Sequence, residues 1–233
     1  MESDPALFSA TELLSTYSQK TLSPVEVTKA VLERIEKYNP VFNAFRIFDA
    51  DSALNEAKAS ETRWSQGKPC GLVDGIPVTI KDLVATKGWS TRRGSLTTSD
   101  DGPWDEDAPL VARLRSHGAI LLGKTTTPEY GWKGVTDSPL TGITRNPWDP
   151  AKTPGGSSGG AAAAAAACMG PLHHGSDGGG SIRMPSGYTG IYGLKPTFGR
   201  VPTWPASGFG TLSHQGPMTR TVDDAALMLT VMA

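Results

Sequence analysis

Residues 154–183 read PGGSSGGAAAAAAACMGPLHHGSDGGGSIR, and this stretch carries most of what the sequence predicts. Its alanines predict a helix over 159–169, because alanine is the best helix former. Glycines and small hydroxyls before a helix present N–H and O–H groups to an anion or an oxyanion. The second glycine run, 177–183, leaves the backbone free to curl around one oxygen, with Ser181 placed to attack a carbonyl held there. Either glycine loop alone is more typical of a flexible linker. Two such loops joined by a short α/β segment are less typical of a linker.

A serine needs a base to become an effective nucleophile, and Lys81 is the best candidate for that base. It ends a predicted strand over 78–81 and has mostly apolar neighbours in the sequence. Burial disfavours a charged ammonium, so we expect its pKa to fall and Lys81 to act as a neutral base. The alternative is a structural ion pair between Lys81 and Asp82, although adjacent strand residues face opposite sides.

Two short motifs suggest other chemistry. Residues 118–125, GAILLGKT, fit the phosphate-loop pattern, but their apolar middle predicts a buried strand at 119–122 instead of an exposed turn. Residues 155–159, GGSSG, fit the nucleophile elbow of α/β-hydrolases and suggest a triad of Ser157, Asp177 and His214. The elbow requires a preceding strand, which the proline-containing segment before it disfavours.

A pair of histidines, His173 and His174, lies in a predicted strand over 172–174. Adjacent strand residues point to opposite faces, so the two rings are not expected to share a metal ion. We interpret them as a partly buried pair that packs near the glycine loop.

Helix and strand signals alternate along the rest of the chain. Capping patterns predict helices over 9–20 and from Pro24, the second ended by Asn39 and Pro40. A strand is expected over 41–48, and the remaining helices are expected over 51–65, 109–116 and 221–232. This alternation predicts an α/β fold with a mixed or parallel sheet covered by helices.

Several segments together resemble the amidase signature family: residues 71–82, 123–129, 146–148, 154–160, 175–183, 193–202 and 216–220. The resemblance implies a mixed β-sheet core covered by helices on both faces. It implies one partial domain over 1–233, with a helical lead-in at 1–66 and a catalytic core at 67–233. Family members are longer, so the C-terminal portion of the fold is expected to be absent.

The resemblance also implies roles for individual residues. Lys81 matches the base, Ser157 the bridging serine on a cis peptide bond, and Ser181 the nucleophile. Gly178, Gly179 and Gly180, with the N–H of Ser181, match the oxyanion hole, and Ser158 is assigned to substrate binding. The implied activity is hydrolysis of a linear carboxylic amide through an acyl-enzyme, with neither a cofactor nor a metal.

Two alternatives stay open beside this amidase. One is the A subunit of a glutamyl-tRNA amidotransferase, which has glutaminase activity and usually has Gln where this chain has Met184. The other is a truncated, non-catalytic remnant. Met184, Trp204 and Phe209 suggest an apolar acyl or aryl group in the substrate and are equally typical of a core.

Composition limits the partners and the location. The net charge of −1 provides no field to hold nucleic acid or an anionic membrane. The two cysteines form no disulfide framework, and no signal peptide or membrane-length apolar run is seen. We expect a cytoplasmic protein that binds a small-molecule amide and can self-associate as a homodimer.

Overall fold

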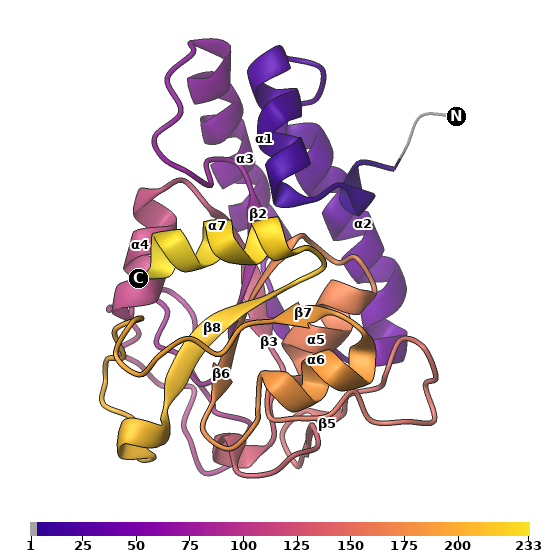
Figure 1. Ribbon diagram of the computed structural model, residues 1–233, viewed down its shortest axis with the longest axis vertical. Helices are drawn as coiled ribbons and strands as arrows, with labels where there is room; N and C mark the ends of the chain where they lie inside the picture. The colour runs from indigo at the N-terminus through magenta and orange to yellow at the C-terminus, as the bar shows by residue number, and fades with distance from the viewer. Residues whose placement is uncertain (1–3) are drawn as a thin grey trace.

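A six-stranded mixed sheet, in the order β1-β3-β2-β6-β8-β7, forms the centre of the computed structural model, which describes residues 4–233 (Figure 1). Its strands are β1 (Phe45–Phe48), β2 (Pro77–Lys81), β3 (Ile120–Thr125), β6 (Leu172–Asp177), β7 (Tyr192–Gly193) and β8 (His214–Thr219). Strand β2 runs parallel to β3 and β6, whereas the outer pairs are antiparallel. A separate two-stranded ribbon joins β4 (Asp137–Ser138) to β5 (Gly142–Ile143). The expected mixed α/β architecture is confirmed.

Three helices form the N-terminal part: α1 (Ala10–Gln19), α2 (Pro24–Phe42) and α3 (Ala50–Ser65). Capping boxes begin α1 and α2, as the sequence predicts. The expected end of α2 at Asn39 and Pro40 is wrong, because the helix continues to Phe42 and the strand begins only at Phe45. The last turn is held by Asn43, a left-handed cap whose N–H donates to the Asn39 carbonyl at 2.7 Å.

The other helices are α4 (Pro109–Ser116), α5 (Gly159–Ala166), α6 (Arg183–Thr189) and α7 (Val222–Met232). Short 3₁₀ turns lie at η1 (Pro5–Leu7), η2 (Glu129–Gly131) and η3 (Gly210–Leu212). Helix α5 packs across β2, β3, β6 and β8, while α7 packs against β6, β7 and β8 and ends beside α4 (Figure 1). The helices thus cover both faces of the sheet and bury its central strands.

Two strand boundaries decide where the site forms. Residues 120–125 make up β3, which is buried along its whole length, so the phosphate-loop pattern is part of the sheet. Strand β6 extends to Asp177, three residues beyond the predicted strand. That extension holds Ser176 and Asp177 in the sheet, immediately before the glycine run.

The first 66 residues are tied to the rest of the chain by more than helix packing. Strand β1 pairs with β3 at the edge of the sheet. Arg63 forms an ion pair with buried Asp74 at 2.6 Å, and the Tyr17 hydroxyl donates to the Gly75 carbonyl at 3.2 Å. The division into a lead-in and a core stays a prediction.

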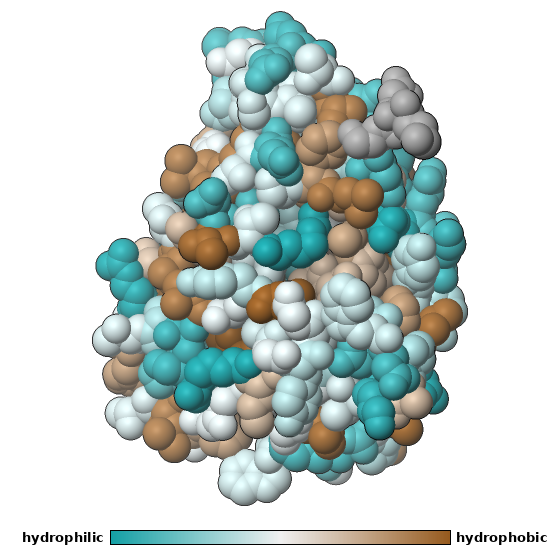
Figure 2. Space-filling view, turned by 45° about the vertical axis from the view of Figure 1, so that its right-hand side comes forward, coloured by the Kyte–Doolittle hydropathy of each residue, from teal (hydrophilic) through white to brown (hydrophobic). Residues whose placement is uncertain are grey.

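The surface mixes polar and apolar residues over the face that Figure 2 displays, with small apolar patches among hydrophilic ones. Between residues 4 and 233, no helix combines the length and the apolar character needed to cross a membrane.

Candidate active site

Lys81 lies at the end of β2 with its side chain fully buried. Its Nζ contacts three hydroxyls: Ser157 Oγ at 2.7 Å, Ser158 Oγ at 2.8 Å and Ser176 Oγ at 3.0 Å. Asp82 instead pairs with Arg46 at 2.7 Å and with Lys124 at 3.6 Å. The alternative of an ion pair between Lys81 and Asp82 is therefore wrong.

Burial lowers the pKa of Lys81 to about 7, against the opposing effect of the Asp177 charge. A neutral amine has two N–H donors and one lone pair. Ser158 Oγ donates its own proton to the Ser176 carbonyl at 3.1 Å, so it accepts one N–H from Lys81. When Ser176 Oγ accepts the second N–H, the lone pair faces Ser157 Oγ. The neutral lysine is thereby directed to take a proton from Ser157.

Ser157 lies in the loop before α5, and its peptide bond with Gly156 is cis, as the family resemblance implies. Nearby segments of the same polypeptide leave no room for side chains at Gly156 and Gly131. A Cβ at Gly156 would lie 2.6 Å from the Val135 carbonyl oxygen, and one at Gly131 would lie 3.2 Å from Ser157 Oγ. The glycines therefore let the backbone pass close to the Ser157 hydroxyl.

The glycine loop after β6 is organised by the Asp177 carboxylate, which is almost fully buried. Its oxygens accept the N–H of Gly180 at 2.7 Å and of Ile182 at 3.1 Å, and Arg183 donates to them twice at 3.0 Å. Burial raises the pKa of this carboxyl, but the hydrogen bonds from Arg183 and the loop N–H groups outweigh it and bring the pKa to about 2. Asp177 thus acts as an internal anchor for the loop, a role that sequence reasoning missed.

The expected oxyanion-hole residues divide into two groups. Gly178, Gly179 and Ser181 line a large cavity, and within residues 4–233 none of their N–H groups has an acceptor. The Gly180 N–H points instead to Asp177. Ser158 is fully buried behind Lys81, away from the cavity wall, and its N–H donates to the Ser181 carbonyl at 3.2 Å.

The hydrolase-type triad does not assemble. His214 Nδ1 contacts the carbonyl oxygens of Leu212 at 2.8 Å and Asp177 at 3.2 Å, not the Asp177 carboxylate. That carboxylate is engaged by Arg183, and Ser157 by Lys81. The interpretation of residues 155–159 as a nucleophile elbow is wrong, because no imidazole of the described residues reaches Ser157.

The cavity beside these groups has a volume of about 830 Å³. Ser157, Ser176 and Ser181 open onto it at one side. Aromatic and charged side chains also line it, and the Trp132 and Phe209 rings stack 5.8 Å apart at an interplanar angle of 12°. Met184, Trp204 and Phe209, for which the sequence allowed either a pocket or a core position, all line the cavity.

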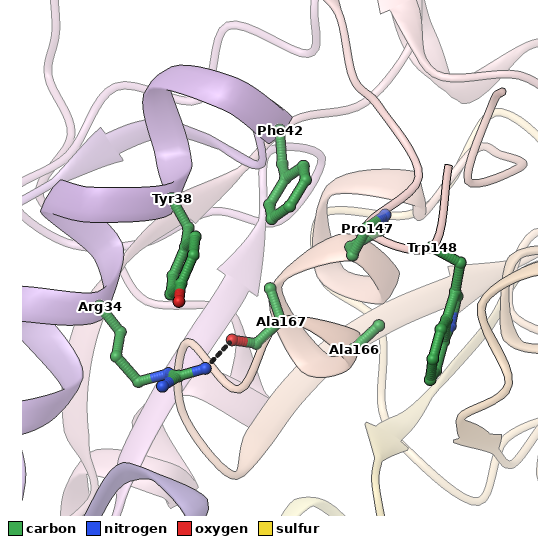
Figure 3. Close-up of a pocket in the computed structure, with 7 residues that line it drawn as sticks. All are labelled: Arg34, Tyr38, Phe42, Pro147, Trp148, Ala166 and Ala167. Carbon is green, nitrogen blue, oxygen red and sulfur yellow. Dashed lines mark hydrogen bonds between the residues drawn. The ribbon is translucent and has the colours of Figure 1, made fainter. Parts of the chain in front are cut away.

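A second pocket of about 210 Å³ lies between α2 and α5. Figure 3 shows Tyr38 and Phe42 of α2 facing Pro147 and the end of α5, with Arg34 donating to the Ala167 carbonyl at 3.1 Å. Its lining contains neither a hydroxyl nucleophile paired with a base nor a carboxylate. The candidate chemistry is therefore in the larger cavity.

The two histidines are fully buried, more deeply than expected. His173 Nδ1 contacts Thr79 Oγ1 at 2.9 Å, while His174 Nε2 contacts Gln215 Oε1 at 2.9 Å. Burial lowers the pKa of each imidazole to about 3. The rings have separate partners, and the described part of the chain holds no group of three His, Cys, Asp or Glu side chains with metal-ligand geometry.

Replacing Asp177 with asparagine is expected to lower the free energy of unfolding by about 2 kcal/mol, because charged hydrogen bonds to buried N–H groups are lost. The pKa of this carboxyl is depressed from 3.8 to about 2, so its stabilisation is present above pH 3.8 and is lost as the pH falls toward 2. Urea unfolding across this range checks both effects. The same change at exposed Asp223 is the control, and an equal loss in both variants would contradict the anchoring role.

Comparisons with known proteins agree with the fold. A family model described as Amidase matches residues 26–233. An acylamidase of Rhodococcus erythropolis is 45% identical over 97% of this chain and 47% of its own length. The A subunit of a glutamyl-tRNA(Gln) amidotransferase from Salinispora tropica is 42% identical over 97% of this chain and 46% of its own length. The crystal structure of a bacterial aryl acylamidase of the amidase signature family matches with a TM-score of 0.89 and 36% identity, over 97% of this chain and 47% of that one.

Proposed function

Because this chain belongs to the amidase family, we propose that it hydrolyses a linear carboxylic amide to an acid and ammonia or an amine. The observation that carries the proposal is the 2.7 Å contact between buried Lys81 Nζ and Ser157 Oγ, beside a loop that brings Ser181 to the same cavity. The chain spans about half the length of the curated relatives it matches, so the activity of the whole protein is part of the proposal.

Acylation begins with neutral Lys81. Its lone pair takes the proton of Ser157, and Ser157 Oγ takes the proton of Ser181 as the Ser181 oxygen attacks the amide carbonyl. The tetrahedral oxyanion is placed against the N–H groups of Gly178, Gly179 and Ser181, which have no acceptor within residues 4–233. The relay then returns a proton to the leaving nitrogen, which departs as ammonia or an amine.

Deacylation repeats the relay with water as the nucleophile. Water gives a proton through Ser157 to Lys81 as its oxygen attacks the ester of Ser181. Collapse of the second tetrahedral intermediate releases the carboxylic acid and restores the Ser181 hydroxyl. Ser158 and Ser176 act as positioning residues, because their contacts with Nζ leave the lysine lone pair for Ser157.

The amidase is preferred to the amidotransferase component because Met184 and aromatic rings line part of the cavity beside Ser181. Apolar side chains favour an aryl group over the charged α-ammonium and α-carboxylate groups of glutamine. The discriminating assay compares ammonia release from phenylacetamide and from glutamine. Hydrolysis of phenylacetamide alone supports the proposal, glutamine hydrolysis alone supports the amidotransferase, and failure with both supports the non-catalytic remnant.

Two further expectations stay predictions. The cytoplasmic location is supported by Cys70 and Cys168, which are free. Homodimer formation is an expectation that light scattering of the purified chain would test.

The rate of amide hydrolysis is expected to rise with pH and to level off above about 7, because only neutral Lys81 accepts the Ser157 proton. Burial depresses this pKa, and the Asp177 charge opposes the depression. Asp177→Asn removes that charge, so it should lower the pKa of Lys81 further. The rise in the rate should then occur at lower pH. The measurement is kcat/KM from pH 5 to 9. If the rate of the variant rose at higher pH than that of the unmodified chain, the assignment to Lys81 would be contradicted.

A further inference from the structure

Gln215 of β8 is a buried amide that faces the cavity and has no part in the mechanism above. Its side chain is 5% exposed, and it lines the cavity together with Ser176 and Ser181. The antiparallel register places Gln215 directly opposite Ser176, whose hydroxyl contacts the Lys81 amine. Opposite residues of antiparallel strands project to the same face, so Gln215 is an immediate neighbour of the lysine network.

His174 determines which end of the Gln215 amide points into the cavity. The Lys81 backbone N–H donates to His174 Nδ1 at 3.4 Å, so this nitrogen is the acceptor of the ring. A neutral imidazole carries its single proton on the other nitrogen. Nε2–H therefore donates to Gln215 Oε1 at 2.9 Å and engages the oxygen of the amide. The ring is held neutral because burial lowers its pKa to about 3.

The amide nitrogen of Gln215 is left with weak partners. Its contacts are the hydroxyls of Ser213 at 3.4 Å and Thr203 at 3.5 Å, both at the limit of hydrogen-bond distance. Both hydroxyls belong to residues of the cavity wall. Two N–H donors are thus directed toward the cavity and can bind a ligand oxygen, since a buried donor without a strong partner gains from one.

We propose that Gln215, oriented by His174, is a substrate-binding residue that selects amides carrying a second carbonyl oxygen beside the scissile one. This inference rests on the proposed amide hydrolysis and names the substrate class of the same cavity. Fixed N–H donors favour an oxygen acceptor at that position over a methyl group of similar size. It also accounts for His174, which works as an orienting residue through Gln215.

The test measures binding by calorimetry to the Ser181→Ala chain, with two pairs of amides. The first pair is 4-oxopentananilide and 4-methylpentananilide. The second is N-(2-oxopropyl)phenylacetamide and N-(2-methylpropyl)phenylacetamide. The members of each pair differ by a carbonyl oxygen in place of a methyl group, and the pair that shows a preference identifies which side of the scissile bond Gln215 contacts.

The ketone member of one pair is expected to bind about 10-fold more tightly. This ratio should fall to about one in Gln215→Met, which lacks the donors, and in Gln215→Glu, which keeps an oxygen for His174 but offers no N–H. Gln66→Met, the same change at an exposed residue outside the cavity, should keep the ratio. Equal binding within both pairs, or a ratio that survives both Gln215 variants, would overturn the proposal.

Failure of the proposed hydrolysis has a different signature. Fluorophosphonate labelling of the unmodified chain reports the Ser181 relay and requires no second carbonyl. A labelled chain without a ketone preference refutes only the role of Gln215. A chain that is not labelled but keeps a Gln215-dependent preference refutes only the catalytic proposal.

Discussion

Replacing Ser181 with alanine is expected to reduce amide hydrolysis by about 10⁴- to 10⁶-fold, because the acyl-enzyme can no longer form. Ser181 is half-buried at the cavity wall and belongs to the loop that Asp177 anchors. Only the background from binding and oxyanion stabilisation should remain. The measurement is kcat/KM for an aryl amide, followed by the absorbance of the released amine.

The matched control for this prediction is Ser207→Ala. Ser207 also lines the cavity, but its hydroxyl accepts the N–H of Phe209 at 3.2 Å and has no link to Lys81. We expect its kcat/KM to stay within a few-fold of that of the unmodified chain. A Ser181→Ala chain that retained more than about 1% of the activity would contradict the assignment of the nucleophile.

Replacing Lys81 with methionine is expected to reduce the rate of fluorophosphonate labelling by about 10²- to 10⁴-fold, the usual contribution of a general base. Methionine fills a similar volume in the buried site but offers no lone pair to Ser157 at neutral pH. Ser157, Ser158 and Ser176 each lose their shared partner. The rate is measured by intact-protein mass against time.

Lys124 provides a closely matched control for Lys81. It lies on the neighbouring strand β3, is fully buried, and burial also lowers its pKa to about 7. Its Nζ donates to the Val84 carbonyl at 2.7 Å and to Thr91 Oγ1 at 2.6 Å instead of to a serine of the relay. Lys124→Met should therefore keep labelling in the folded chain. If both variants lost the same fraction of the labelling rate, the buried amines would matter only for folding.

Local chemistry made several segments of the candidate site predictable, whereas the role of Ser157 came from the family resemblance. The glycine runs, the alanine helix and the apolar surroundings of Lys81 were all visible in the sequence, and the structure brings Lys81, Ser157 and Ser181 to one place. A buried strand was also predicted here instead of a phosphate loop, at 119–122, and the structure places it at 120–125. These features depend on residues close together in the chain.

Three features that depend on the folded geometry of the backbone were not predicted. The roles of Ser176 and Asp177 follow from the extension of β6, which is held by pairing with β8 some forty residues later. Helix α2 continues through Pro40 to Phe42, and the Asn39 side chain accepts the N–H groups of Ala44 and Phe45 beyond the helix end. The Gly180 N–H, expected in the oxyanion hole, is taken by a carboxylate whose position only the folded loop reveals.

The central claim is that Ser181 is the nucleophile and Lys81, acting through Ser157, is its base. The most direct measurement is reaction of the purified chain with a fluorophosphonate, followed by peptide mapping of the modified residue. The account predicts a single adduct on Ser181 that Lys81→Met suppresses and Lys124→Met does not. An adduct on Ser157, or none on a folded chain, would contradict it.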